Sequence, residues 1–143
     1  MGPSALLLAA ASVAAAPALP TVGMAPVVAG ARACLALMAG RTAPAGWVAT
    51  PPALVRSDGR SFVRDGVAIT GSRRGCWLQA RADGSYHMRE LADGLATALN
   101  ARASEALGHV LLHLPDGRLA VLDGAQKGGS SYIFLRIADA KGT

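Results

Sequence analysis

The sequence predicts an α+β fold. We expect a small antiparallel sheet (a meander plus a C-terminal hairpin) packed with one long amphipathic helix and a short N-terminal helix, and closed by one disulfide. Three observations predict this fold. Asp-Gly occurs six times between short apolar runs, one later segment repeats apolar residues at helical spacing, and the chain has two cysteines. Its 143 residues are enough for one domain.

The start of the chain predicts export. No charged side chain occurs before Arg32, and the apolar run Ala5–Ala16 has the length of a signal-peptide core, below the roughly 20 residues that cross a bilayer. Residues 1–30 are therefore expected to be a signal peptide and residues 31–143 a single domain. Small residues permit cleavage at several bonds after Ala18 to Ala31. The expected location is periplasmic or secreted, with no stable transmembrane span after processing.

An alternative remains open for this segment. A signal peptide normally begins with Lys or Arg, and this one has neither. Either the true start lies upstream, or the apolar segment stays attached as an uncleaved membrane anchor. Pro17, Pro20 and Pro26 argue against one continuous helix there, because proline interrupts helices.

The two cysteines predict one structural bridge. In an exported chain, Cys34 and Cys76 are expected to form a disulfide. If the chain stays in the cytoplasm, two buried thiols are the alternative. A reactive cysteine would need a lowered thiol pKa, for which Arg73 and Arg74 are the nearby cations.

The meander is predicted from short runs separated by turn residues. A short helix over 29–38, ended by Gly40, comes first, and Trp47 and Val48 suggest a short extended piece. On the run that begins at Cys76, alternation turns Cys76 inward and Trp77 outward. The predicted strands are Ala53–Arg56, Ser61–Arg64, Val67–Thr70 and Cys76–Arg81.

The strongest helix is predicted over Tyr86–Arg102, where Leu91, Leu95 and Leu99 recur at helical spacing. A hairpin follows, with strands His109–Leu114 and Leu119–Leu122 around a Pro-Asp-Gly-Arg turn, and then a last strand, Tyr132–Ile137. The residues predicted to face the core are Val110, Leu112, Leu114, Leu119, Val121, Ile133, Leu135 and Ile137. Those predicted on the opposite face are His109, Leu111, His113, Tyr132, Phe134 and Arg136.

No catalytic, cofactor or metal motif is recognised. His109 and His113 have a spacing that holds zinc on a helix, but on a strand they lie about 13 Å apart. The glycine-rich stretch over 124–131 lacks the Lys-Ser/Thr pair of a phosphate loop. We therefore expect no cofactor and no metal.

Two surfaces are candidates for binding. Aromatic and arginine side chains are enriched at interfaces, so the outer face of the last strand is expected to contact a protein or glycan unless the long helix covers it. A second, basic group is expected to attract anions, unless it is ordinary solvated charge. The candidate residues are Tyr132, Phe134 and Arg136 for the first surface, and Arg56, Arg60, Arg64, Arg73, Arg74 and Arg81 for the second.

These features favour a non-enzymatic envelope or secreted binding protein for an anionic or protein partner. The formal net charge of +5 attracts anions, but nucleic acid is not the expected partner of an exported protein. One alternative is an accessory or structural subunit of an envelope assembly, which would expose a mostly apolar face. Another is a small hydrolase whose site is assembled in space and joins a histidine to a carboxylate or hydroxyl.

Overall fold

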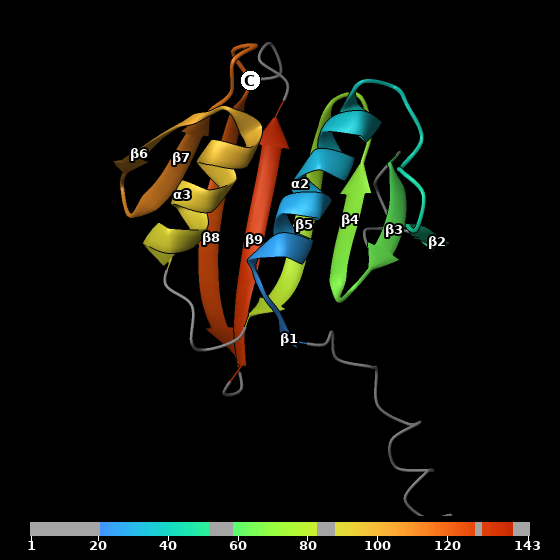
Figure 1. Cartoon of the computed structure of the whole chain (residues 1–143), viewed down its shortest axis with the longest axis horizontal. Helices are drawn as coiled ribbons and strands as arrows, with labels where there is room; N and C mark the ends of the chain where they lie inside the picture. The colour runs from blue at the N-terminus through green and yellow to red at the C-terminus, as the bar shows by residue number, and fades with distance from the viewer. Residues whose placement is uncertain (1–20, 52–58, 83–87, 128–129, 139–143) are drawn as a thin grey trace, which may run out of the picture.

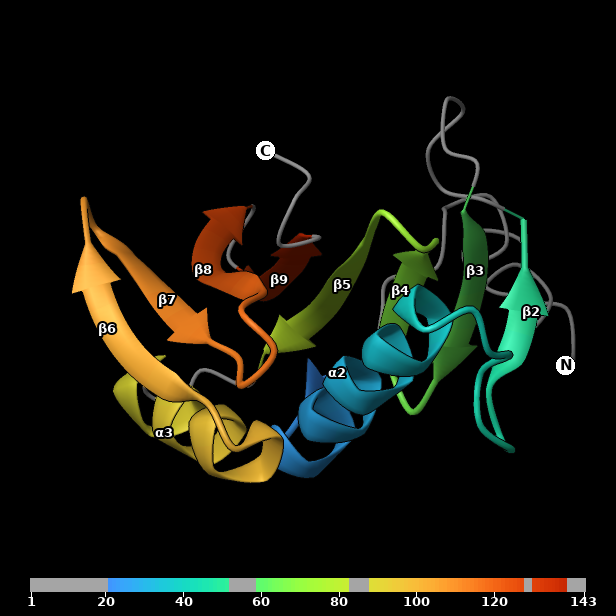
Figure 2. The same cartoon turned by 90° about the horizontal axis from the view of Figure 1, so that it is seen from above.

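The computed structural model describes residues 21–51, 59–82, 88–127 and 130–138. These residues form one large sheet with both described helices on the same face (Figures 1 and 2). The strand order is β2-β3-β4-β5-β9-β8-β7-β6, all antiparallel, and β1 pairs in parallel with β5 off this path. The elements are β1 (Thr21–Val22), α2 (Met24–Met38), β2 (Val48–Thr50), β3 (Arg60–Arg64), β4 (Val67–Gly71), β5 (Gly75–Ala82), α3 (Met88–Leu99), β6 (Arg102–Ala106), β7 (His109–His113), β8 (Leu119–Lys127) and β9 (Ser130–Ala138).

The chain repeats one arrangement twice. The helix α2 is followed by the meander β2 to β5, and α3 is followed by the meander β6 to β9. The two meanders join through the antiparallel pair β5–β9 at the centre of the sheet. As a result, residues from distant parts of the sequence become neighbours on these central strands.

The predicted fold class is wrong in its proportions. The expected small sheet is a nine-stranded one, because the predicted meander and hairpin join into a single sheet. The expected short N-terminal helix has 15 residues, and the expected long helix has 12. The predicted strand at Ala53–Arg56 lies outside the described residues. The predicted disulfide is confirmed: Cys34 and Cys76 are joined, with their Cα atoms 5.5 Å apart.

The helix boundaries differ from the prediction for identifiable reasons. Pro26 lies in the first turn of α2, where a missing backbone N–H has no intrahelical acceptor to lose, so the helix begins at Met24. At the end of α3, Asn100 adopts a left-handed conformation (φ 55°), and the N–H of Ala101 donates to the carbonyl of Ala96. This C-terminal cap ends the helix at Leu99 and frees the following residues for β6.

The helix α2 packs closely on the sheet. A Cβ atom at Gly30 would lie 2.6 Å from the Cδ1 of Leu78 and 2.9 Å from a Val67 methyl group, so this crossing leaves no room for a side chain. The disulfide joins the same helix to β5, and both sulfurs lie in the core. In α3, by contrast, a Cβ atom at Gly94 would overlap the end of the Met24 side chain, which is flexible and 41% exposed and can therefore shift aside at little cost.

The β7–β8 hairpin has a different register from the predicted one. The N–H of Leu114 donates to the carbonyl of Arg118, so the loop has three residues and closes with Gly117 at φ 91°. Since side chains alternate along a strand, changing the loop by one residue reverses the face of every residue in β8. Leu122 is therefore buried, and Val121, predicted inside, faces the other side. The inward prediction for Leu119 is wrong for the same reason.

Candidate binding surface

The helices leave one face of the sheet uncovered. In both views α2 and α3 lie on the same side (Figures 1 and 2). On the opposite side, called the open face from here, side chains of adjacent strands form cross-strand rows. The central row runs from Thr70 on β4 through Trp77 on β5 and Arg136 on β9 to Val121 on β8. Trp77 is 43% exposed, so the row has an accessible aromatic side chain at its centre.

Two hollows adjoin this row. The first, of about 280 Å³, lies beside the β4–β5 turn and includes Arg74 and Ser72. The second, of about 270 Å³, lies toward β8 and includes Phe134 and Asp123. Trp77 and Arg136 line both hollows, so they stand between the two. Together the hollows make one shallow track across the central strands.

The outer face of β9 points away from the core, as the alternation predicts. Ile133, Leu135 and Ile137 are buried, whereas Arg136 is exposed and Phe134 is half-buried. The rings of Tyr132 and Phe134 stack with their centroids 6.3 Å apart. Neither described helix covers these side chains, and this was the condition for the predicted binding role. The role itself stays a prediction.

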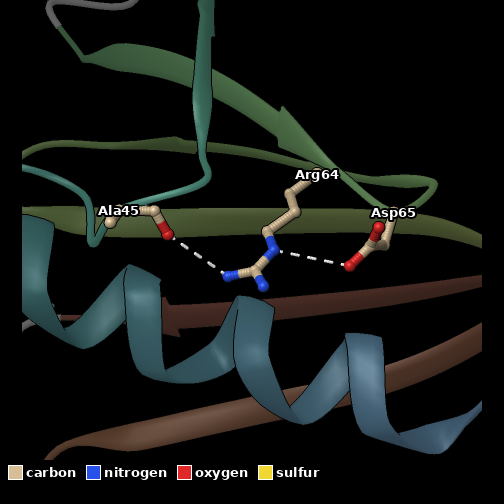
Figure 3. Close-up of polar contacts among 3 residues, drawn as sticks. All are labelled: Ala45, Arg64 and Asp65. Carbon is tan, nitrogen blue, oxygen red and sulfur yellow. Dashed lines mark hydrogen bonds and ion pairs between the residues drawn. The ribbon is translucent and has the colours of Figure 1, made fainter.

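The predicted basic group divides into two sets. In the first set, three arginines hold the loop between α2 and β2. Arg60 donates to the carbonyl of Arg41 at 2.9 Å, and the Arg73 guanidinium lies against Gly40. Arg64 donates to the carbonyl of Ala45 at 3.3 Å and pairs with Asp65 at 3.4 Å (Figure 3).

These three guanidinium groups bind backbone carbonyls or cover a glycine of the loop, which explains them without a ligand. The second set remains available. Arg74 lines the first hollow, and Arg81 lies on the open face in register with Tyr132. Among the described residues, no hydrogen bond or ion pair occupies the guanidinium groups of Arg74, Arg81 and Arg136. Arg56 lies outside the described residues.

An unpaired guanidinium is a strong donor to a ligand anion. Arginine presents five N–H groups in a planar fork that matches carboxylates and sulfates. Both Arg74 and Arg136 line the first hollow, with the hydroxyl-bearing residues Thr70 and Ser72 beside them. This end of the track is therefore suited to an acid group.

The two histidines among the described residues form separate pairs on the outer strands of the open face. His109 pairs with Asp123, and Nε2 of His113 lies 2.9 Å from the hydroxyl oxygen of Ser104. His109 and His113 are four residues apart on β7, which places them about 13 Å from each other. The two pairs therefore do not combine into a serine–histidine–aspartate site.

A third hollow, of about 520 Å³, lies on the other side of the sheet, between α3 and β6. Its charged residues are Arg89, Asp93 and Glu105, and its one cation, Arg89, pairs with Glu105 at 3.2 Å. Because this guanidinium group already has an anionic partner, the third hollow is a less suitable anion site than the open face.

Two further findings concern the described part of the chain. It contains no cluster of three or more histidine, cysteine or acidic side chains arranged to hold a metal ion. None of its helices combines the length and the apolar character needed to cross a membrane.

Trp77 was placed on the outer face by the sequence pattern but was not counted among the candidate binding residues. Its neighbour Arg136 comes from the other end of the chain, through the pairing of β5 with β9. The alternation in β5 was the only signal available for Trp77, and it gives the face but not the neighbours. In comparisons with known proteins, the chain matches no family model, no curated protein and no solved structure at a significant level.

Proposed function

We propose that this chain is an exported, non-enzymatic binding protein whose open face holds an anionic envelope component or a protein partner. One observation carries the proposal: exposed Trp77 lies in register with Arg136, whose guanidinium has no partner among the described residues, on a face that neither described helix covers. Aromatic and arginine side chains are enriched where proteins bind ligands and partners.

Export is supported by the disulfide and by the apolar run at the start of the chain. Disulfides persist outside the reducing cytosol, and this one lies in the core. Signal cleavage after Ala18 would leave α2 intact. Cleavage after Gly30 or Ala31 would remove the first half of α2, including Val27, which is fully buried. We therefore propose processing near Ala18.

The charge and apolar pattern favours a binding protein over an accessory subunit. A subunit of a stable assembly would present a contiguous apolar face. The exposed large apolar side chains of the described residues are Met24, Val48, Trp77, Leu107 and Leu119. They do not form one patch: Met24 and Leu107 lie off the sheet faces, and the other three lie on β2, β5 and β8 of the open face without being direct cross-strand neighbours.

Site-directed photo-crosslinking in the native host tests the proposal. A photoreactive amino acid at Gln79, exposed on the open face, should give a specific adduct. The same amino acid at Thr97, exposed on α3, is the matched control and should give none. The adduct yield should fall as ionic strength rises from about 0.1 M to about 1 M, where the Debye length shrinks from about 10 Å to about 3 Å.

Each outcome decides between the readings. A salt-sensitive adduct at position 79 alone supports a binding protein with a charged partner. An adduct that persists at high salt supports the accessory subunit. Equal labelling at positions 79 and 97, or no adduct at either, contradicts the proposed binding face.

A further inference from the structure

We infer that the track on the open face binds an acidic oligosaccharide. Its acid group would lie between Arg74 and Arg136, with a sugar ring over Trp77. This inference rests on the proposed function and names the ligand class for the same face. It follows from three features: where the track lies in the sheet, how its charges are distributed, and which side chains line it.

The position of the track argues against a peptide added as a strand. Peptides that extend a sheet bind at an edge, where backbone groups are unpaired. The track lies over β4, β5, β9 and β8, in the interior of the sheet, where the backbone N–H and carbonyl groups are used in strand pairing. A ligand here must therefore bind through side chains.

The charges are distributed unevenly along the track. Arg74 and Arg136 line its first hollow, and Asp123 lies in the second. Asp123 pairs with His109 and lies two strands away from Trp77, about 10 Å across the sheet. A ligand with an acid on every unit would bring a like charge toward Asp123. A ligand with an acid at one end and hydroxyl groups at the other fits both hollows. Its acid would lie in the first hollow, and the carboxylate of Asp123 in the second would accept hydrogen bonds from its hydroxyl groups.

The lining of the track is amphipathic, which suits a sugar ring: most of its exposed surface is apolar, and the guanidinium groups of Arg74 and Arg136 add polar groups. Protein interfaces bury an apolar core, whereas the exposed neighbours of Trp77 are Arg136 on the adjacent strand and Gln79 two residues along β5. Guanidinium and amide groups offer donors and acceptors to the polar edge of a sugar. The flat indole offers its face to the apolar side of a ring. The track is therefore complementary to a ring with one apolar side and polar edges.

Calorimetry on the full disulfide-bonded chain, with four defined probes at low ionic strength, tests the inference. The probes are a hyaluronan tetrasaccharide, with a carboxylate on alternate rings, the neutral chitotetraose, dextran sulfate, and tetraglutamate. We expect the hyaluronan tetrasaccharide to bind at least about tenfold more tightly than chitotetraose. Dextran sulfate carries acid groups on every unit, so its comparison with the hyaluronan tetrasaccharide tests the expected preference for spaced acid groups.

Variants locate the binding. Arg136→Gln and Arg74→Gln should each weaken saccharide binding about tenfold. Arg102→Gln removes the same charge from an exposed position on β6, outside both hollows, and should change binding by less than about twofold. Trp77→Ala should weaken binding of the saccharide several-fold but leave binding of tetraglutamate unchanged, and Trp77→Phe should restore part of the loss.

Three results would overturn the inference. If tetraglutamate binds at least as tightly as the saccharide and Arg136→Gln weakens both, the face binds acidic peptides, and the proposed function stands while the ligand class fails. If Arg136→Gln and Arg102→Gln have equal effects on every probe, only net charge matters, and both proposals fail. If no acidic saccharide binds the wild-type chain, the ligand class fails, and crosslinking at position 79 decides the function separately.

Discussion

Removing the disulfide should cost about 4 kcal/mol of folding free energy. Cys34 and Cys76 are 42 positions apart. For a loop of that length, the chain-entropy relation gives a loss of about 13 cal/mol/K of conformational entropy in the unfolded chain, which is about 4 kcal/mol at 25 °C. The free energy of unfolding of a small domain is only about 5–15 kcal/mol, so this bridge accounts for a large share of the total.

Urea unfolding measures this loss. Since both sulfurs are buried, the chain should be reduced while unfolded and refolded under reductant. The reduced chain should lose about 4 kcal/mol relative to the oxidised chain, with a larger denaturant slope, because its unfolded state exposes more surface. A variant with both cysteines replaced by alanine should lose a similar amount, plus the small cost of the void left by the two sulfur atoms.

Comparing the two samples separates the crosslink from the packing. If reduced wild-type chain keeps its stability to within about 1 kcal/mol while the double alanine variant loses several, the sulfur atoms matter as core filling and the entropic reasoning is refuted. If neither sample loses more than about 1 kcal/mol, the bridge does not stabilise the fold, and it no longer supports export.

Three more results are expected. Gly30→Ala should destabilise the protein by about 1–3 kcal/mol, because the crossing of α2 over the sheet has no space for a side chain. Gly94→Ala should stabilise it by about 0.5–1 kcal/mol, because alanine favours a helix more than glycine does. Thermal unfolding measures both changes, and equal shifts would contradict the described packing. Leu122→Asp should cost more than about 4 kcal/mol and Val121→Asp about 1 kcal/mol, and the reverse order in urea unfolding would show that the β7–β8 register is wrong. The intact mass of the exported protein should show a chain that begins near residue 19; a mass that places the cut inside α2 would contradict the proposed processing.

Local patterns predicted most of the central elements. The strands β3, β4 and β5 follow from turn residues and apolar alternation, and their boundaries differ from the predicted ones by a residue or so. The β3–β4 turn shows the reason: Asp65 and Gly66 both have positive φ, which is the two-residue turn that Asp-Gly favours. These signals act within a few residues, so a sequence is enough to recognise them.

The size of the sheet could not be predicted from such patterns. β6 reads Arg-Ala-Ser-Glu-Ala and is mostly exposed, so it has neither the β-branched residues nor the clear alternation that identify a strand. It forms because Asn100 ends α3 and because Leu107 and Gly108, both at positive φ, turn the chain into β7. Tertiary pairing therefore decides the structure of this segment, against its local preference.

The same limit applies to the binding surface. The sequence predicted a basic meander because residues 53–81 contain six arginines and only two aspartates. In the fold, the loop after α2 exposes carbonyl groups that need donors, and Arg60 and Arg64 supply them. An arginine that reaches an unpaired carbonyl becomes part of the structure, whereas one without such a carbonyl within reach, like Arg74 in the β4–β5 turn or Arg136 on β9, keeps its donors for a ligand. Charge counts do not distinguish these two cases, but backbone hydrogen bonding does, and it selects Arg74 and Arg136.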